Sequence, residues 1–251
     1  MNASFLIPII GLAIGFLSGV FGVGGGVMST PILRLLLGAA PLIALGTPLP
    51  ATIPTALAGV YNYLREKKIN REVALPCAGG GLIGTIGGSF ATGFLPVKGL
   101  MLLTAGLIGL VGIDFLLGRR SLKERPSEEK EIFWPSLFIG LMGGFLSGLL
   151  GLGGGVFFVP AFLLVLRMPL KTALGTSLLV VSAVAIPGSI IHWRLGHVDS
   201  HLLFLLTIGM IPGAFSGSLL AMKANDRRLK GLYGFFLAAI AILFAWEEAI
   251  Y

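Results

Sequence analysis

Charged residues are scarce in this chain of 251 residues: only 12 % are Asp, Glu, Lys or Arg, whereas soluble domains contain about 25 %. So few charges cannot cover the surface of a soluble domain, and 55 % of the residues are hydrophobic. A single cysteine, Cys77, excludes an intramolecular disulfide and any metal or iron–sulfur site built from several cysteines. We interpret Cys77 as a small packing residue. The composition predicts a polytopic membrane protein with no soluble domain.

The sequence also lacks the patterns of enzymes and pumps. No nucleophile–base pair, carboxylate dyad, His/Cys metal spacing or Walker loop occurs in it. We therefore expect no enzymatic activity, no metal or other cofactor, and no ATP hydrolysis by this chain. The first apolar segment lacks the basic start of a signal peptide, so we expect it to be retained as a membrane element.

An internal repeat organises the chain. The segment GLAIGFLSGVFGVGGGVMSTP at 11–31 returns as GLMGGFLSGLLGLGGGVFFVP at 140–160, without a gap and with 13 of 21 positions identical. The same alignment of the two copies maps the LGT of 45–47 onto that of 174–176, and the GxxxGxxxG pattern of 80–88 onto that of 209–217. The chain is therefore a tandem duplication.

Each half contains five predicted helical membrane elements. Both halves begin with an apolar segment (5–22 and 132–150), a glycine break and a short apolar arm (27–38 and 156–167). Three long segments follow in each half, at 41–64, 72–94 and 99–117, and at 169–193, 202–222 and 231–247. An odd number of elements turns the second half upside down relative to the first, as in many secondary transporters. We expect an all-α protein with a first membrane repeat over 1–118, a cytoplasmic linker over 119–131 and an inverted repeat over 132–251.

The distribution of basic residues supports this inversion independently. Short cytoplasmic loops of membrane proteins carry an excess of Lys and Arg. If the 65–71 loop is cytoplasmic, then 118–131, 167–171 and 223–230 are too, and 15 of the 18 Lys and Arg lie on that side. Both termini are then extracytoplasmic. The net charge of +7 is explained by topology, so we expect a lipid bilayer and not nucleic acid as the partner of these residues.

The short arms 27–38 and 156–167 cannot cross a bilayer, because twelve helical residues span about 18 Å of a ~30 Å core. We interpret each as the returning arm of a re-entrant hairpin with a glycine tip. Two inverted hairpins bring their tips together near the midplane, where the positive ends of both arms point at one small space. A small anion is the natural occupant. The alternative is that the glycines only permit tight helix packing.

Hydroxyl groups complete the predicted site. Ser18 and Ser147 lie one helical turn before the tips, and Thr47, Thr176 and Ser177 lie on the next helix. Each can line an access path or bond to a carbonyl of its own helix. The predicted substrate-binding residues are Gly22, Gly24, Gly25, Gly26, Ser18, Thr47, Gly151, Gly153, Gly154, Gly155, Ser147, Thr176 and Ser177.

Other conspicuous residues have simpler interpretations. We expect the GxxxG patterns to serve helix packing alone. Arg34 either attracts an anion at the outer mouth or extends to the lipid headgroups. His192 lies beside Trp193, which suggests an interfacial residue, with proton sensing as the alternative. Asp114 lies near Arg119 and Arg120, which suggests an interfacial ion pair, with a proton relay as the alternative.

The duplicated GxxSGxxGxGGGxxxxP of 15–31 and 144–160, followed by LGT at 45–47 and 174–176, resembles the TauE/SafE family of sulfite exporters and related permeases. The resemblance covers almost the whole chain. It implies a transporter of the bacterial inner membrane that exports sulfite, sulfoacetate or other small sulfur-containing anions. It also implies that the tip glycines and the two LGT threonines are family positions. Pro48 stands where the second copy has Ser177, so the two halves do not offer the same hydroxyl there.

The sequence alone leaves two other function classes open. An anion channel needs a continuous pore, whereas two glycine tips that meet look like an occluding site. A membrane accessory or scaffold protein of sulfur or metal metabolism needs a surface for partners, and the chain has no large soluble part. We predict a secondary transporter of small anions that works by alternating access; a homo-oligomer and coupling to protons stay open.

Overall fold

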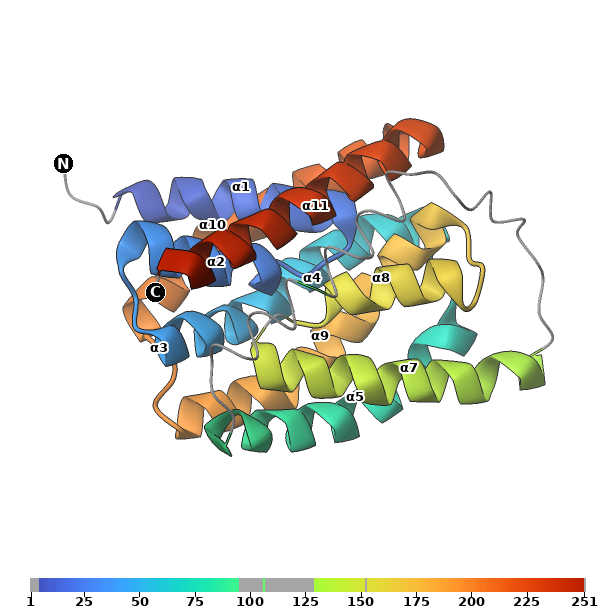
Figure 1. Ribbon diagram of the computed structural model, residues 1–251. Helices are drawn as coiled ribbons and strands as arrows, with labels where there is room; N and C mark the ends of the chain where they lie inside the picture. Colours follow the sequence, from blue (N-terminus) through green and yellow to red (C-terminus); the bar gives the residue numbers. More distant parts are fainter. Residues whose placement is uncertain (1–4, 95–105, 107–128, 152, 251) are drawn as a thin grey trace.

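The computed structural model describes residues 5–94, 106, 129–151 and 153–250, and this part of the chain is helical without any strand (Figure 1). Five described stretches are long and apolar enough to cross a membrane: Pro41–Arg65, Arg71–Ala91, Ile132–Leu150, Leu170–Arg194 and Ser200–Lys223. The elements are α1 (Leu6–Phe21), α2 (Gly26–Leu37), α3 (Pro41–Gly46), α4 (Pro48–Arg65), α5 (Arg71–Ala91), the 3-10 helix η2 (Thr92–Phe94), α7 (Glu129–Leu150), α8 (Gly155–Leu164), α9 (Leu170–Arg194), α10 (Ser200–Lys223) and α11 (Asp226–Ile250).

Most predicted segments correspond to helices, with differences at their ends. The segment 41–64 is two helices, because Thr47 separates α3 from α4 and Pro48 is the first residue of α4. The helix α7 begins at Glu129, inside the expected linker 119–131, and α11 begins at Asp226, inside the expected loop 223–230. The predicted segment 99–117, with Asp114, lies outside the described residues, as does the linker before Glu129.

A seam of glycines joins α1 of the first half to α10 of the second. A Cβ placed at Gly15 of α1 would strike the main chain of Met210 on α10. In the opposite direction, a Cβ at Gly213 of α10 would strike the main chain of Leu12 on α1. Small residues let two membrane helices approach this closely. The packing interpretation of the GxxxG pattern is therefore confirmed for this seam.

An equivalent seam joins α7 of the second half to α5 of the first. A Cβ at Gly144 would strike the main chain of Gly81, and one at Gly84 would strike that of Leu141. These contacts are the counterparts, within the repeat, of those in the α1–α10 seam. The first helix of each half thus packs on a helix of the other half, and the two halves interlock.

The helices α4 and α9 form the middle of the bundle. They pack against each other, and they lie between the α1–α10 pair and the α5–α7 pair (Figure 1). A Cβ at Gly59 of α4 would come within 2.8 Å of Leu178 Cδ1 on α9. The beginning of α1 and the end of α11 lie at the same end of the bundle (Figure 1).

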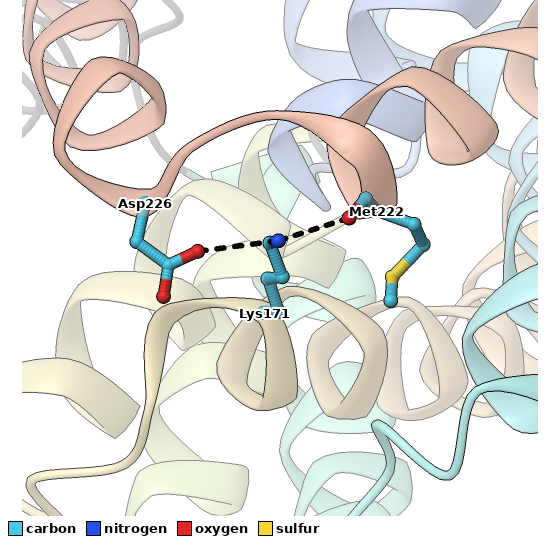
Figure 2. A network of polar contacts seen from close by, with 3 residues as sticks. All are labelled: Lys171, Met222 and Asp226. Atoms are coloured by element: carbon cyan, nitrogen blue, oxygen red, sulfur yellow. Dashed lines mark hydrogen bonds and ion pairs between the residues drawn. The ribbon is translucent and has the colours of Figure 1, made fainter.

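A lysine ties the corner between α10 and α11 to α9. Figure 2 shows Lys171 at the start of α9, where its Nζ donates to the carbonyl of Met222 at 2.9 Å and lies 3.3 Å from Asp226 Oδ1. The ammonium group meets the negative end of α10. Because the Asp226 side chain is more than half exposed, the ion pair alone is worth at most about 1 kcal/mol. The residue equivalent to Lys171 in the first half is Leu42, whose side chain cannot donate a hydrogen bond or form an ion pair.

Candidate functional site

The two hairpins turn on glycines in the left-handed backbone region. A side chain costs roughly 1–2 kcal/mol there, so the turns require glycine. The values of φ are 70° at Gly22, 78° at Gly24, 87° at Gly25, 63° at Gly151, 72° at Gly153 and 75° at Gly154. The described glycines of the two tips therefore turn in the same way.

Two short helices begin directly at these turns. Gly25 is the N-cap of α2 and Gly154 is that of α8, and neither supplies a side-chain cap to the first amides. Gly26 and Gly155 are the first helical residues. The first N–H groups of a helix have no partner within the helix and form the positive end of its dipole. Both tips therefore present main-chain donors.

The arms that return from the tips are short. The helix α2 has 12 residues and α8 has 10, so both arms are short, as the sequence predicts. Pro31 and Pro160 are the sixth residues of these helices, which is one turn later than the first-turn position where a proline is tolerated best. Neither proline can donate the main-chain bond that its position would make to Val27 or Val156. This leaves the arms less firmly bonded than an uninterrupted helix.

The tips touch each other, as the repeat predicts. A Cβ at Gly155 would strike the main chain of Val23 in the first tip. The first tip is also held by the second half, because the Ser177 hydroxyl on α9 donates to the Gly22 carbonyl at 2.9 Å. Gly22 itself packs on α9, where a Cβ would come within 2.9 Å of Leu174 Cα.

One pair of side chains lies against both tips. A Cβ at Gly153 would lie 3.2 Å from Thr52 Cγ2 on α4 and 3.7 Å from Val181 Cγ1 on α9. A Cβ at Gly24 would lie 3.0 Å from the same Thr52 carbon and would strike the same Val181 carbon. Thr52 and Val181 occupy equivalent positions of the two halves. Sequence reasoning missed both, and the only signal for them was the alignment of the two halves, because neither lies in the glycine motif.

Ser18 and Ser147 lie beside the tips. Both are fully buried, and neither hydroxyl has a hydrogen-bond partner among the described residues. A Cβ added at Gly25 would lie 3.8 Å from Ser18 Oγ. A Cβ added at Gly154 would lie 3.1 Å from Ser147 Cβ. A buried hydroxyl without a partner costs about 1–3 kcal/mol. An oxygen atom of a bound anion would accept from each hydroxyl and recover this cost.

Thr47 and Thr176 make their contacts elsewhere. The Thr47 hydroxyl oxygen accepts the main-chain N–H of Asp199, and that of Thr176 accepts the N–H of Asn70, each at 3.0 Å. Asp199 and Asn70 are the N-caps of α10 and α5. The two threonines therefore bind the start of a helix in the other half. The structure brings together the glycines, Ser18, Ser147 and Ser177, and it places the threonines at the adjoining loops.

The charged and titratable candidates lie away from the tips. Arg34 is buried in the last turn of α2, about 12 Å along the helix from Gly26. His192 is fully buried inside the protein, whereas its neighbour Trp193 is 53 % exposed. The two side chains differ because consecutive residues point to different faces of a helix. In the described part of the chain no cluster of three or more His, Cys, Asp or Glu could hold a metal.

Comparisons with known proteins place the chain in a family. The family described as "Sulfite exporter TauE/SafE" matches residues 7–244. "Probable membrane transporter protein YdhB" of Bacillus subtilis is 30% identical over 216 residues, which cover 85% of this chain and 88% of that protein. A "Probable membrane transporter protein" of Xylella fastidiosa is 29% identical over 240 residues, 94% of this chain and 92% of its own.

The similarity extends beyond bacteria. "Probable membrane transporter protein MJ0441" of Methanocaldococcus jannaschii is 25% identical over 256 residues, covering 94% of this chain and 93% of that protein. No solved structure is significantly similar to the chain. With five apolar helices long enough to span a bilayer and a family match over nearly its whole length, this chain is a multi-pass membrane protein and belongs to the sulfite exporter TauE/SafE family.

Proposed function

We propose that this protein is a secondary transporter that exports small sulfur-containing anions, such as sulfite or organosulfonates, by alternating access. One observation carries the proposal: the N-termini of α2 and α8 meet at touching glycine tips, beside two buried serine hydroxyls without partners among the described residues. Helix N-termini favour negative charge. The three oxygens of sulfite accept hydrogen bonds from N–H and O–H donors, and such charge-assisted bonds are strong.

We also propose that the two halves are inverted in the bacterial inner membrane, with both termini extracytoplasmic. The odd number of predicted elements and the side on which the basic residues fall support this orientation. The seams α1–α10 and α5–α7, which pair equivalent glycines of the repeat, support two equivalent halves. The beginning of α1 and the end of α11 lie at one end of the bundle, in keeping with termini on one side (Figure 1).

An asymmetry between the tips favours alternating access over a channel. The first tip accepts a hydrogen bond from Ser177, but the equivalent position in the first half is Pro48, which cannot donate to the second tip. Among the described residues, the first tip thus receives a hydroxyl hydrogen bond that the second tip cannot receive from the equivalent position. Two tips that touch also close the path between them, so passage requires one tip to move away from the other.

Flux through the purified protein in proteoliposomes tests the substrate class. We expect saturable transport of sulfite or sulfoacetate, competition by a second oxyanion, and no transport of a simple amine or a divalent cation, because both helix ends repel positive charge. Uptake of radiolabelled sulfite, sulfoacetate, sulfate, amine and cation measures this selectivity. Saturable transport of the amine or the cation would contradict the anion site, and a conductance that does not saturate would favour a channel.

Labelling of paired cysteines tests the inverted topology. Glu66 and Leu195 are equivalent residues, each exposed and each the C-cap of its helix, α4 and α9 respectively. In a background with Cys77→Ala, we expect Leu195→Cys to react with an impermeant maleimide added to whole cells, and Glu66→Cys to react only after permeabilisation. Reaction of both residues from the same side would show that the halves are parallel.

A further inference from the structure

A pair of histidines lies outside the anion site. His192, in the last turn of α9, is fully buried. Its Nε2 lies 3.1 Å from the carbonyl oxygen of Gly148 on α7, and its Nδ1 lies 3.3 Å from Nδ1 of His197 in the loop that follows. The loop of His197 packs on α3, where a Cβ at Gly46 would come within 2.8 Å of His197 Cβ.

The partners determine where the ring protons are. The Gly148 carbonyl can only accept, so His192 carries a proton on Nε2 and donates it to that oxygen. In the neutral ring, Nδ1 of His192 is then an acceptor, and His197 donates its own Nδ1–H to it. The remaining nitrogen of the pair, Nε2 of His197, is left as a base on a ring that is only partly buried.

The first half shows that this helix contact needs no histidine. The residue equivalent to His192 is Tyr63, and its hydroxyl donates to the Gly19 carbonyl of α1 at 3.3 Å. Gly19 is the equivalent of Gly148, so the same contact joins α4 to α1 and α9 to α7. The residue equivalent to His197 is Lys68. Imidazole rings, which can take up a proton, therefore occupy these two positions only in the second half.

We propose that His192 and His197 together bind one proton from the side of the 195–199 loop, and that this proton loosens the contact between α9 and α7 and so speeds anion transport. The effect on transport rests on the proposed function, whereas proton binding itself does not. A proton from water binds Nε2 of His197. The Nδ1–H bond of His197 then breaks as that proton passes to Nδ1 of His192, which leaves His197 neutral and His192 positively charged.

Among the described residues, the helices packed around His192 carry no charged side chain that could compensate a positive His192. The stretches 79–91 of α5, 132–150 of α7, 41–60 of α3 and α4, and 155–164 of α8 contain no ionisable side chain. In the loop and at the ends of α9 and α10 lie Arg194, Asp199 and His201. The Asp199 carboxylate already accepts the amides of His201 and Leu202 at 2.9 and 3.0 Å.

Two opposing energies decide whether a charged His192 tightens or loosens the contact between α9 and α7. A positive His192 strengthens its hydrogen bond to Gly148, but a buried charge without a countercharge costs more than one charge-assisted bond recovers. The charged ring therefore favours an arrangement in which α9 and α7 separate and water reaches it. Gly148 is the neighbour of Ser147 and lies shortly before the tip glycine Gly151, so this separation frees the second hairpin. Burial lowers the pKa of His197, so the pair takes up its proton on the acid side of neutrality.

Ring NMR of the protein in nanodiscs tests proton binding without any substrate. The chain has only three histidines, so single substitutions assign every ring signal. We expect the ring signals of His192 and His197 to report one shared proton-binding step between about pH 5 and pH 8, and His197→Asn to remove this step from His192. His201→Asn, at an exposed histidine nearby, is the control and should leave the shared step unchanged. A His192 ring that stays neutral over this range, or ignores His197→Asn, would overturn the proposal.

Flux of sulfoacetate tests the effect on transport, because both acid groups of this anion stay ionised above about pH 5. We expect the wild-type flux to rise by more than about threefold from pH 8 to pH 5.5, since a single proton site changes from empty to filled over this range. His192→Tyr, which installs the residue of the first half, and His197→Asn should flatten this rise, and His201→Asn should retain it. An equal rise in all variants would overturn the link to transport. If the wild type carries no sulfur anion at all, the proposed function fails, and the NMR titration still decides the proton site.

Discussion

Alanine at Gly25 is expected to abolish anion transport while leaving a folded protein in the membrane. The φ of 87° makes any side chain strained there, at roughly 1–2 kcal/mol. The added methyl would meet the terminal Cε of Met210, which is the flexible end of a side chain and can move, and it would lie 3.8 Å from Ser18 Oγ. It therefore obstructs the serine hydroxyl and the first amides of α2 without striking the backbone of another helix. Sulfite counterflow in proteoliposomes measures the loss.

Gly38 provides the matched control for this variant. It ends the same helix, has a φ of 61°, and a Cβ there would have no atom within 4 Å. Gly38→Ala should therefore show backbone strain of the same kind, though less because its ψ is 26° where that of Gly25 is −29°, and near-normal transport. Equal transport by the two variants would remove Gly25 from the anion site. Misfolding of Gly25→Ala alone would show that this glycine serves packing.

Leucine at Gly80 is expected to prevent the protein from folding. Its Cβ would strike the Leu137 carbonyl and come within 3.0 Å of the Leu141 amide, both main-chain atoms of α7 that cannot move aside. Overpacking of a core costs about 1–3 kcal/mol when side chains can adjust, and a clash with backbone costs more. We expect loss of monodisperse protein in size-exclusion chromatography and a large fall in thermal stability in detergent.

The neighbouring Gly79 is the control for this seam. It is exposed on the same helix, and a Cβ there would meet nothing within 4 Å. Gly79→Leu should be neutral or slightly stabilising, because glycine within a helix is about 1 kcal/mol less favourable than a good helix former. Equal stability of Gly80→Leu and Gly79→Leu would show that α5 and α7 do not form this seam.

The sequence predicted the elements of the described fold and the meeting of the tips because both follow from local patterns. Hydrophobic runs and glycine breaks mark the helices, and the repeat implies two tips that face each other. The partners of the glycine helices could not be predicted in this way. A GxxxG pattern indicates that Gly80 and Gly209 approach some helix closely, but the choice of a helix from the other half depends on the three-dimensional arrangement.

The partners of the polar side chains could not be predicted from local patterns either. The sequence allows two roles for the hydroxyls of Thr47 and Thr176, and the structure shows a third, in which each accepts a main-chain N–H from the other half. His192 follows the same rule: it is buried while its neighbour Trp193 is exposed, so the surroundings of Trp193 do not predict those of His192. In each case a residue's environment comes from a segment distant in the sequence, and no local pattern encodes it.

The interlocked seams limit how the molecule can cycle. In a transporter whose halves are separate bodies, one half can rock against the other like two halves of a clamp. Here such a motion would pull α1 from α10 and α7 from α5 at once, and each seam is a row of backbone contacts without flexible side chains between the helices. We therefore expect the α1–α10 and α5–α7 pairs to stay together during the proposed transport cycle. In the proposed cycle the parts that can move are then the arms α2 and α8, each interrupted by a proline, and the contact between α9 and α7, while the two glycine-packed pairs act as rigid units.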